Sequence, residues 1–364
     1  MVGEPQRQFR QQPLRGGFLG LDNIGVFDRS APLPTGGFLE QADGTAWMAF
    51  YSQTMLEIAV ELAAHDRAYE DVAANFVVHF VLIARAMNNI GEGMWDEEDG
   101  FYYDILRRPD GVTTRLKVRS MVGLLPLGAV TVIEKWQRER VSKLAEHLSA
   151  RLQQMPELVG SIQASGHRGV AERGILALVN EDRLRRILST MLDEDEFLSP
   201  YGIRALSRYH ADHPYVFTVH DQEHRVHYLP AESDTGMFGG NSNWRGPIWV
   251  PVNILLIRAL LQYYLYFGDN FKIECPTGSG NSMNLFEVAR EIAARLTRIF
   301  LRDQSVRRPV FGGAEKFQND PRRQWGRHWR QSSNRVDGFG GDADRSLWAP
   351  GRQKLSRNRP CRRL

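Results

Sequence analysis

The sequence has few of the features that mark disulfide-rich, metal-binding or membrane proteins. Its 364 residues include only two cysteines, Cys275 and Cys361, too few for a disulfide framework or a cysteine-based zinc site. The first 15 residues are polar and lack the apolar core of a signal peptide. The most apolar run, residues 246–267, contains Arg258 and two prolines, which predicts a buried helix rather than a membrane span. These absences favour a cytoplasmic protein with no membrane partner.

Excess charge is also small overall, because a basic tail offsets an acidic body. The net charge is +3, but residues 321–364 hold eleven Arg and one Lys against three Asp, a balance of +9. Residues 1–320 therefore carry −6, the difference between +3 and +9. A basic tail can bind nucleic acid. This tail has no basic helix face, and no nucleic-acid-binding fold is visible, so we expect no nucleic-acid partner.

The histidines do not form a metal-binding pattern. Five of them lie close together in the chain, but their spacings match no closed site: His210, His213, His220, His224 and His227. Histidines in loops are more often polar surface groups. The sequence therefore predicts no metal and no cofactor.

A glycine-rich segment, residues 16–51, holds acidic and aromatic side chains that salt-bridge spacing does not explain. Its glycines permit tight turns and close approach of a ligand, and its prolines exclude one continuous helix. It contains Asp22, Asp28 and Asp43, and Trp47 follows them. Aromatic faces stack on sugar rings, and carboxylates bind hydroxyls or transfer protons, which suits a polyhydroxylated ligand. A solvated loop of turn-forming residues would have the same composition, so both interpretations stay open.

A second segment, residues 236–257, joins a loop rich in glycine and asparagine to an apolar helix. Pro247 suits the first turn of that helix. The segment also supplies stacking faces, a guanidinium fork and an amide, from Trp244, Trp249, Arg245 and Asn243. Tryptophan packing at a helix end with a surface arginine would explain the same residues.

Hydrophobic periodicity predicts about seven helices, most of them in antiparallel pairs. We expect them over residues 45–64, 68–88, 118–136 (from Pro126), 137–154, 182–192, 247–268 and 284–301. Residues 94–115 contain two Asp-Gly pairs around an aromatic, partly alternating run, which predicts a β-hairpin. Residues 198–215 are expected to be a loop. The predicted class is all-α, a toroid or solenoid of helical hairpins with a small β-hairpin excursion.

Four motifs together resemble a bacterial branch of glycoside hydrolase family 63, which includes processing α-glucosidases and, nearby, mannosylglycerate hydrolases. In chain order they are GGFLGLDNIGVFDRS, EQADGTAWMAFYSQTMLEIA, MWDEEDGFYYDILRRPDG with LKVRSMVGLLPL, and NSNWRGPIWVPVN. The resemblance covers residues 16–320 and is specific for the family, not for the substrate. It implies an (α/α)6 toroid with the site at one end. It also implies inverting hydrolysis of α-glucosidic or α-mannosyl bonds, in oligosaccharides or small glycosides, by two carboxylic acids roughly 6.5–9.5 Å apart.

The resemblance assigns roles to particular residues. Asp22 matches the Gly-x-Asp in which the family keeps its general acid, and its apolar neighbours in the sequence would raise its pKa as an acid requires. Asp43 is the second candidate and is implied to bind sugar hydroxyls. The Trp-Arg-Gly of residues 244–246 matches the loop that faces the substrate. The predicted substrate-binding set is Asp43, Trp47, Asn243, Trp244, Arg245 and Trp249.

The general base is not found. In this family it is a glutamate near the C-terminus, and nothing after Asp320 matches; Glu315 precedes the end of the likeness. Codons for residues 321–338 can be chosen that spell HGDNGAGIGASHQTGWTG in another frame, which resembles the missing family end. Residues 10–15 are likewise compatible with GNNLFE. We therefore expect frame changes at both ends, with a non-matching segment over 1–15, a catalytic-domain portion over 16–320 and a disordered tail over 321–364.

An acid without a base predicts slow hydrolysis by the chain as written, because nothing takes the proton from the attacking water. The predicted helices are also fewer than six hairpins require, which would leave an apolar patch uncovered. The alternative is a non-catalytic or vestigial sugar-binding helical protein. In either case the expected partner is a carbohydrate.

Overall fold

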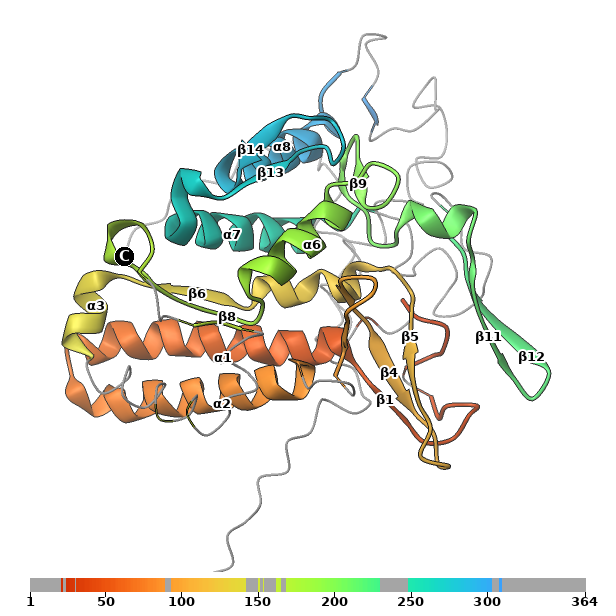
Figure 1. The fold of residues 1–364 in the computed structure, drawn as a ribbon, viewed down its shortest axis with the longest axis horizontal. Helices are drawn as coiled ribbons and strands as arrows, with labels where there is room; N and C mark the ends of the chain where they lie inside the picture. The colour runs from red at the N-terminus through yellow and green to blue at the C-terminus, as the bar shows by residue number, and fades with distance from the viewer. Residues whose placement is uncertain are drawn as a thin grey trace, which may run out of the picture.

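Helix α1 (Ala42–Ala63) and helix α2 (Glu70–Asn88) form an antiparallel hairpin along one edge of the molecule (Figure 1). The computed structural model describes residues 21, 24–29, 31–88, 93–141, 150, 153, 162–164, 168–229, 248–302 and 308–309. The 3₁₀ turn Arg67–Tyr69, capped by Asp66, joins the two helices. Alanines on the inner face of α1 let α2 approach closely, and Phe80 fills the seam. This confirms the predicted hairpin.

A second pair of helices lies on the other side of the molecule. Helix α7 (Val250–Phe267) packs against α8 (Leu285–Arg298), and Asn284 and Glu287 start α8 with a reciprocal capping box. Helix α6 (Glu181–Met191) is capped by Asn180, and α3 (Lys135–Arg140) is short. The helix predicted over residues 137–154 is interrupted: α3 ends at Arg140 and Val141 is not helical, whereas Ala150 and Gln153 are helical. The rest of that span is outside the described residues. Among the described residues, one helical segment, Val250–Asn270, is long and apolar enough to cross a membrane. Inside the protein, 39% of its 18-residue apolar window is buried.

Short antiparallel strands form six small sheets in the described part of the chain. Two sheets have three strands: β1 (Phe38–Glu40), β4 (Asp104–Arg107) and β5 (Thr113–Leu116); and β6 (Val130–Ile133), β8 (Gly174–Ala177) and β7 (Gln163–Ala164). Four are two-stranded: β2 (Trp95–Asp96) with β3 (Phe101–Tyr102), β9 (Leu198–Ser199) with β10 (Gly202–Ile203), β11 (Tyr215–Val219) with β12 (Gln222–Val226), and β13 (Lys272–Glu274) with β14 (Ser282–Asn284).

The predicted all-α toroid is therefore wrong as a description of this structure, which mixes helices with several small sheets. The strands are two to five residues long, too short for the period-2 alternation that identifies a strand in a sequence. Pro126 is the second residue of a 3₁₀ turn, Leu125–Gly128, rather than the start of a longer helix, and strand β6 follows the turn. The Asp-Gly turns of residues 94–115 are confirmed, but they belong to two hairpins, β2–β3 and β4–β5.

Helices α1 and α7 run parallel on either side of strand β6 (Figure 1). Midway along α1, Glu57 accepts hydrogen bonds from Thr131 of β6 and from Arg258 of α7. At their C-terminal ends, both helices are bonded to the region of α3: Arg140 donates to the carbonyl of Ala64, and Arg173, which pairs with Glu134, donates to that of Leu265. The N-terminal ends of α1 and α7 consequently lie at the same end of the molecule.

Candidate active site at the start of helix α1

A fully buried ion network lies where α1 begins. Arg29 reaches Asp43 with Nη1, 2.6 Å from Oδ2, and reaches Asp104 of β4 with Nη2. The three residues have exposed fractions of 5%, 0% and 6%. Buried charges persist only when they are paired and hydrogen-bonded, so these groups hold one another in place.

The two carboxylates also cap the helix. Asp104 Oδ1 accepts the N–H of Ala42 at 2.8 Å, and Asp43 Oδ1 accepts the N–H of Gly44 at 2.8 Å. The first N–H groups of a helix have no partner within it, and its N-terminus favours negative charge. This explains why α1 starts at Ala42, three residues before its predicted start.

Burial and the neighbouring charges act in opposite directions on the pKa values of Arg29 and Asp104. Burial lowers the pKa of Arg29, but Asp104 and Asp43 outweigh burial and leave that pKa above its ordinary value. Burial raises the pKa of Asp104 above its ordinary value, and the Arg29 charge offsets this only in part. Asp104 therefore binds a proton more readily than an exposed aspartate does.

A small cavity adjoins the network. It has a volume of about 10 Å³ and is lined by the loop of residues 24–29 and by alternate residues of the segment after β5: Leu116, Val118, Ser120 and Val122. Arg29 and Asp104 also line it. A cavity of this volume is about the size of one water probe, so it does not hold a sugar ring.

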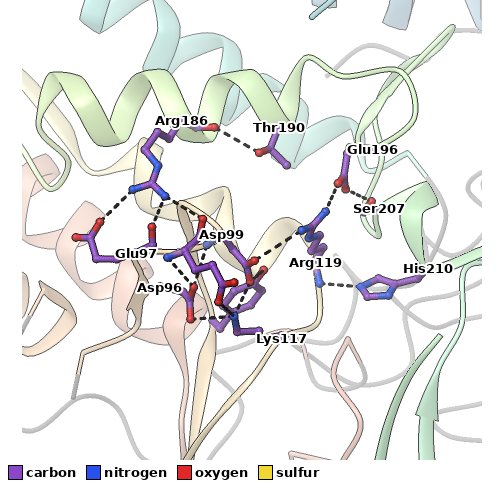
Figure 2. A network of polar contacts seen from close by, with 12 residues as sticks. Asp96, Glu97, Asp99, Lys117, Arg119, Arg186, Thr190, Glu196, Ser207 and His210 are labelled. Carbon is purple, nitrogen blue, oxygen red and sulfur yellow. Dashed lines mark hydrogen bonds and ion pairs between the residues drawn. The ribbon is translucent and has the colours of Figure 1, made fainter. Parts of the chain in front are cut away.

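The intervening residues of the same segment, Lys117 and Arg119, belong to a second polar network (Figure 2). Lys117 Nζ lies 3.2 Å from Asp96 and 3.0 Å from Asp99. Burial raises the pKa of Asp96, but the backbone N–H of Asp99 and the ammonium of Lys117 outweigh it and lower that pKa. Arg119 extends the network to Glu196, which also accepts from Ser207.

His210 closes the second network as a neutral base. Its Nε2 accepts the N–H of Arg119 at 2.9 Å, so its Nδ1 carries the proton and donates to the carbonyl of His213 at 2.9 Å. Burial lowers the pKa of His210 to about 4. The described residues contain no group of three or more His, Cys, Asp or Glu side chains that could hold a metal ion.

The segment 203–206 connects the cavity to the start of α7. On one side Leu206 bridges Ser120, and Met121 donates to the carbonyl of Ala205 at 2.7 Å. On the other side Arg204 bridges Ile248. Asn253 of α7 stabilises the same connection. Its Oδ1 accepts the backbone N–H of Ile203, and its Nδ2 donates to the carbonyls of Ile203 and Trp249.

The structure brings some of the predicted site residues to this end of the molecule. Asp43 lies at the start of α1 and is buried; Trp47 follows one turn later, half-buried and edge-on to Phe50, with ring centroids 6.3 Å apart. Trp249 precedes α7 and is buried in the main core. The other predicted residues, Asp22, Asn243, Trp244 and Arg245, are outside the described residues.

Three residues that hold this site together were not identified from the sequence: Arg29, Asp104 and Asn253. Arg29 stands in the loop motif as Asp28-Arg29-Ser30, directly after the apolar Val26 and Phe27, so a charged residue close to an apolar pair was an available signal. Asp104 is 61 residues from Asp43, and nothing in the sequence pairs them.

The structure combines paired helices and small sheets with buried carboxylates at the start of a helix. Comparison with known families identifies the chain as a member of a glycosidase family. The glycosyl hydrolase family 63 C-terminal domain matches residues 38–279, which include Asp43, Asp104 and Trp249. The chain belongs to this family, as the motifs indicated.

Two fungal proteins are similar to the chain. It is 46% identical over 351 residues to "Uncharacterized protein YMR196W" of Saccharomyces cerevisiae, a match that covers 92% of this chain and 32% of that protein. It is 32% identical over 83 residues to "Probable mannosyl-oligosaccharide glucosidase" of Schizosaccharomyces pombe, covering 23% of this chain and 7% of that protein. The chain thus spans about a third of the first relative. Neither match shows the predicted bacterial branch.

Proposed function

We propose that this protein is an inverting glycosidase that cleaves α-glucosidic bonds of oligosaccharides, with the active site at the end of the molecule where α1 and α7 begin. Membership of family 63 and the similarity to a probable mannosyl-oligosaccharide glucosidase support the reaction class. One structural observation carries the location. Residues 203–206 contact Ile248, directly before Trp249, on one side and residues 120–121 on the other, and Ser120 lines the cavity together with the loop of residues 24–29. This supports a site at the end of the molecule that both motif-bearing loops approach.

In the proposed mechanism, Asp22 protonates the glycosidic oxygen as the bond to the anomeric carbon breaks. Sugar binding falls to Trp244, Arg245 and Asn243, as the family motif implies, together with Trp47 in α1 and Trp249 directly before α7. A glucosyl unit offers hydroxyls to the guanidinium and amide, and an apolar ring face to the indoles. The general base is not assigned, and the prediction that the chain lacks one stays a prediction.

Azide tests the acid and the missing base together. The azide anion attacks the anomeric carbon without losing a proton, so it needs no base, whereas the leaving oxygen still needs the acid. We expect the purified chain to cleave an α-linked glucose disaccharide, whose leaving sugar oxygen must be protonated, slowly in buffer and faster with azide, forming a glucosyl azide. Asp22→Asn should lower the azide-dependent rate by roughly 10²–10⁴-fold, because the amide keeps the shape and cannot donate the proton.

Other results would change the proposal. Equal turnover with and without azide would show that the chain contains its own base. Loss of activity in Asp43→Asn, with none in Asp22→Asn, would reverse the assignment of the acid. Retention on immobilised oligosaccharide with no turnover in either condition would favour the sugar-binding alternative.

A further inference from the structure

The loop of residues 21–29 is closed into a ring by a single oxygen atom. Oδ2 of Asp43 accepts the backbone N–H of Leu21 at 2.6 Å and Nη1 of Arg29 at 2.6 Å, so it holds both the first and the last residue of the loop. Inside the ring, Ile24 is buried in the main core and Phe27 in the smaller apolar cluster beside β11–β12. The described residues of the loop are thus held by two hydrogen bonds to Asp43 and by the burial of Ile24 and Phe27.

The other oxygen of Asp43 is also occupied. Oδ1 accepts the N–H of Gly44, and the side chain has no exposed surface. A carboxylate that already accepts three bonds within the fold, and is closed to solvent, offers no geometry for direct contact with a sugar hydroxyl. In the structure Asp43 therefore bonds to groups of the protein rather than to a ligand. One of its partners, Leu21, directly precedes Asp22 in the sequence.

We propose that Asp43, Arg29 and Asp104 are positioning residues that fix the loop carrying the catalytic acid. Arg29 transmits the restraint, because its planar fork reaches Asp43 with one nitrogen and Asp104 with the other, and so ties the loop to strand β4 as well as to α1. The inference rests on the proposed function for the role of Asp22. It replaces direct sugar binding as the role of Asp43.

Two conservative variants test the proposal. Arg29→Lys keeps the charge but loses the fork, and Asp104→Asn keeps an acceptor for the N–H of Ala42 but loses the charge that faces Arg29. Arg107→Gln is the matched control: it breaks an ion pair with the buried Glu40 in the same three-stranded sheet, Nε to Oε1 2.8 Å. We expect both test variants to lower kcat in azide by about 10–100-fold, the effect of a small misplacement of a reacting group, with KM within about twofold of wild type. The control should retain the wild-type kcat.

Hydrogen exchange gives a readout that does not depend on activity. Peptides covering residues 21–29 should exchange faster in Arg29→Lys and Asp104→Asn than in wild type or Arg107→Gln. Unchanged exchange in a folded test variant would overturn the proposal. So would a raised KM with unchanged kcat, because that pattern belongs to a direct substrate contact.

Failure of the proposed function would look different. If wild type shows no turnover even with azide, while the loop peptides still exchange faster in the two test variants, then the loop anchor stands and the glycosidase assignment falls. If wild type turns over and the test variants match it in both kcat and exchange, the anchor falls and the glycosidase assignment stands.

Discussion

The molecule contains two polar networks built from similar groups in very different settings. Asp43, Arg29 and Asp104 are closed to solvent, whereas Lys117 pairs with Asp96 and Asp99 with 38% of its own side chain exposed. Coulombic attraction in a buried setting is far less screened than at the surface, and the loss of one buried partner leaves an unpaired charge. The comparison teaches that the first network is where the fold is least tolerant of change.

Removing a buried partner should have the largest effect. Asp104→Ala takes one of the two anions from Arg29 and the cap from Ala42, so we expect the free energy of unfolding to fall by about 3–5 kcal/mol. Urea unfolding followed by circular dichroism measures it. A loss below about 1 kcal/mol would show that the buried network contributes no more than a surface pair.

Acid should weaken the second network at His210. Its pKa is lowered to about 4 in the folded protein, below the ordinary 6.5, so the unfolded chain binds more protons between these values. Stability is therefore complete above about pH 6.5 and falls as the pH drops toward 4, by on the order of 3 kcal/mol. Urea unfolding at several pH values measures the slope. His210→Gln should reduce that slope, and His213→Gln, on an exposed residue, should not.

A helix start at the surface offers a milder comparison with the start of α1. Asn284 caps α8 by accepting the N–H of Glu287 at 2.9 Å, in a partly exposed setting. Asn284→Ala should cost about 1 kcal/mol of stability, and Asn284→Gly only a few tenths, as expected of an ordinary cap. Thermal unfolding of both variants checks this. A cost equal to that of Asp104→Ala would remove the distinction between buried and exposed caps.

The half-exposed network should show the smallest effect. Lys117→Met removes the ammonium from Asp96 and Asp99, and we expect a loss of roughly 0.2–1 kcal/mol that shrinks further as salt is added. Urea unfolding in low and high salt measures both the loss of stability and its dependence on salt. A large, salt-independent loss would place Lys117 in the same class as Arg29.

The sequence was sufficient for the long helices, because apolar residues at three- and four-residue steps identify α1, α2, α7 and α8. It was insufficient for the sheets. Strands of two to five residues carry no usable alternation, so the β6–β8–β7 sheet between α1 and α7 was missed and the class was taken as all-α. The β11–β12 hairpin, which extends away from the body in Figure 1, starts at Tyr215, where a loop was expected to end.

The candidate site was predictable where motifs carry it and not where long-range pairing does. Asp43 and Trp249 follow from the sequence, and the structure places them at the starts of α1 and α7. The pairing of Asp43 with Arg29 and Asp104 depends on how β4 packs beside the helix start, 61 residues away along the chain. Periodicity and spacing report on neighbours within an element, so they could not show that Asp43 is buried.

The configuration of the first product tests the account most directly. Proton nuclear magnetic resonance of the reaction of an α-linked glucose disaccharide with azide distinguishes α- from β-glucosyl azide, and these two anomers do not interconvert because the anomeric carbon carries no free hydroxyl. An inverting site with its acid at Asp22 predicts β-glucosyl azide from the wild-type chain, and none above background from Asp22→Asn. The α-anomer, or product formed equally well by Asp22→Asn, would contradict it.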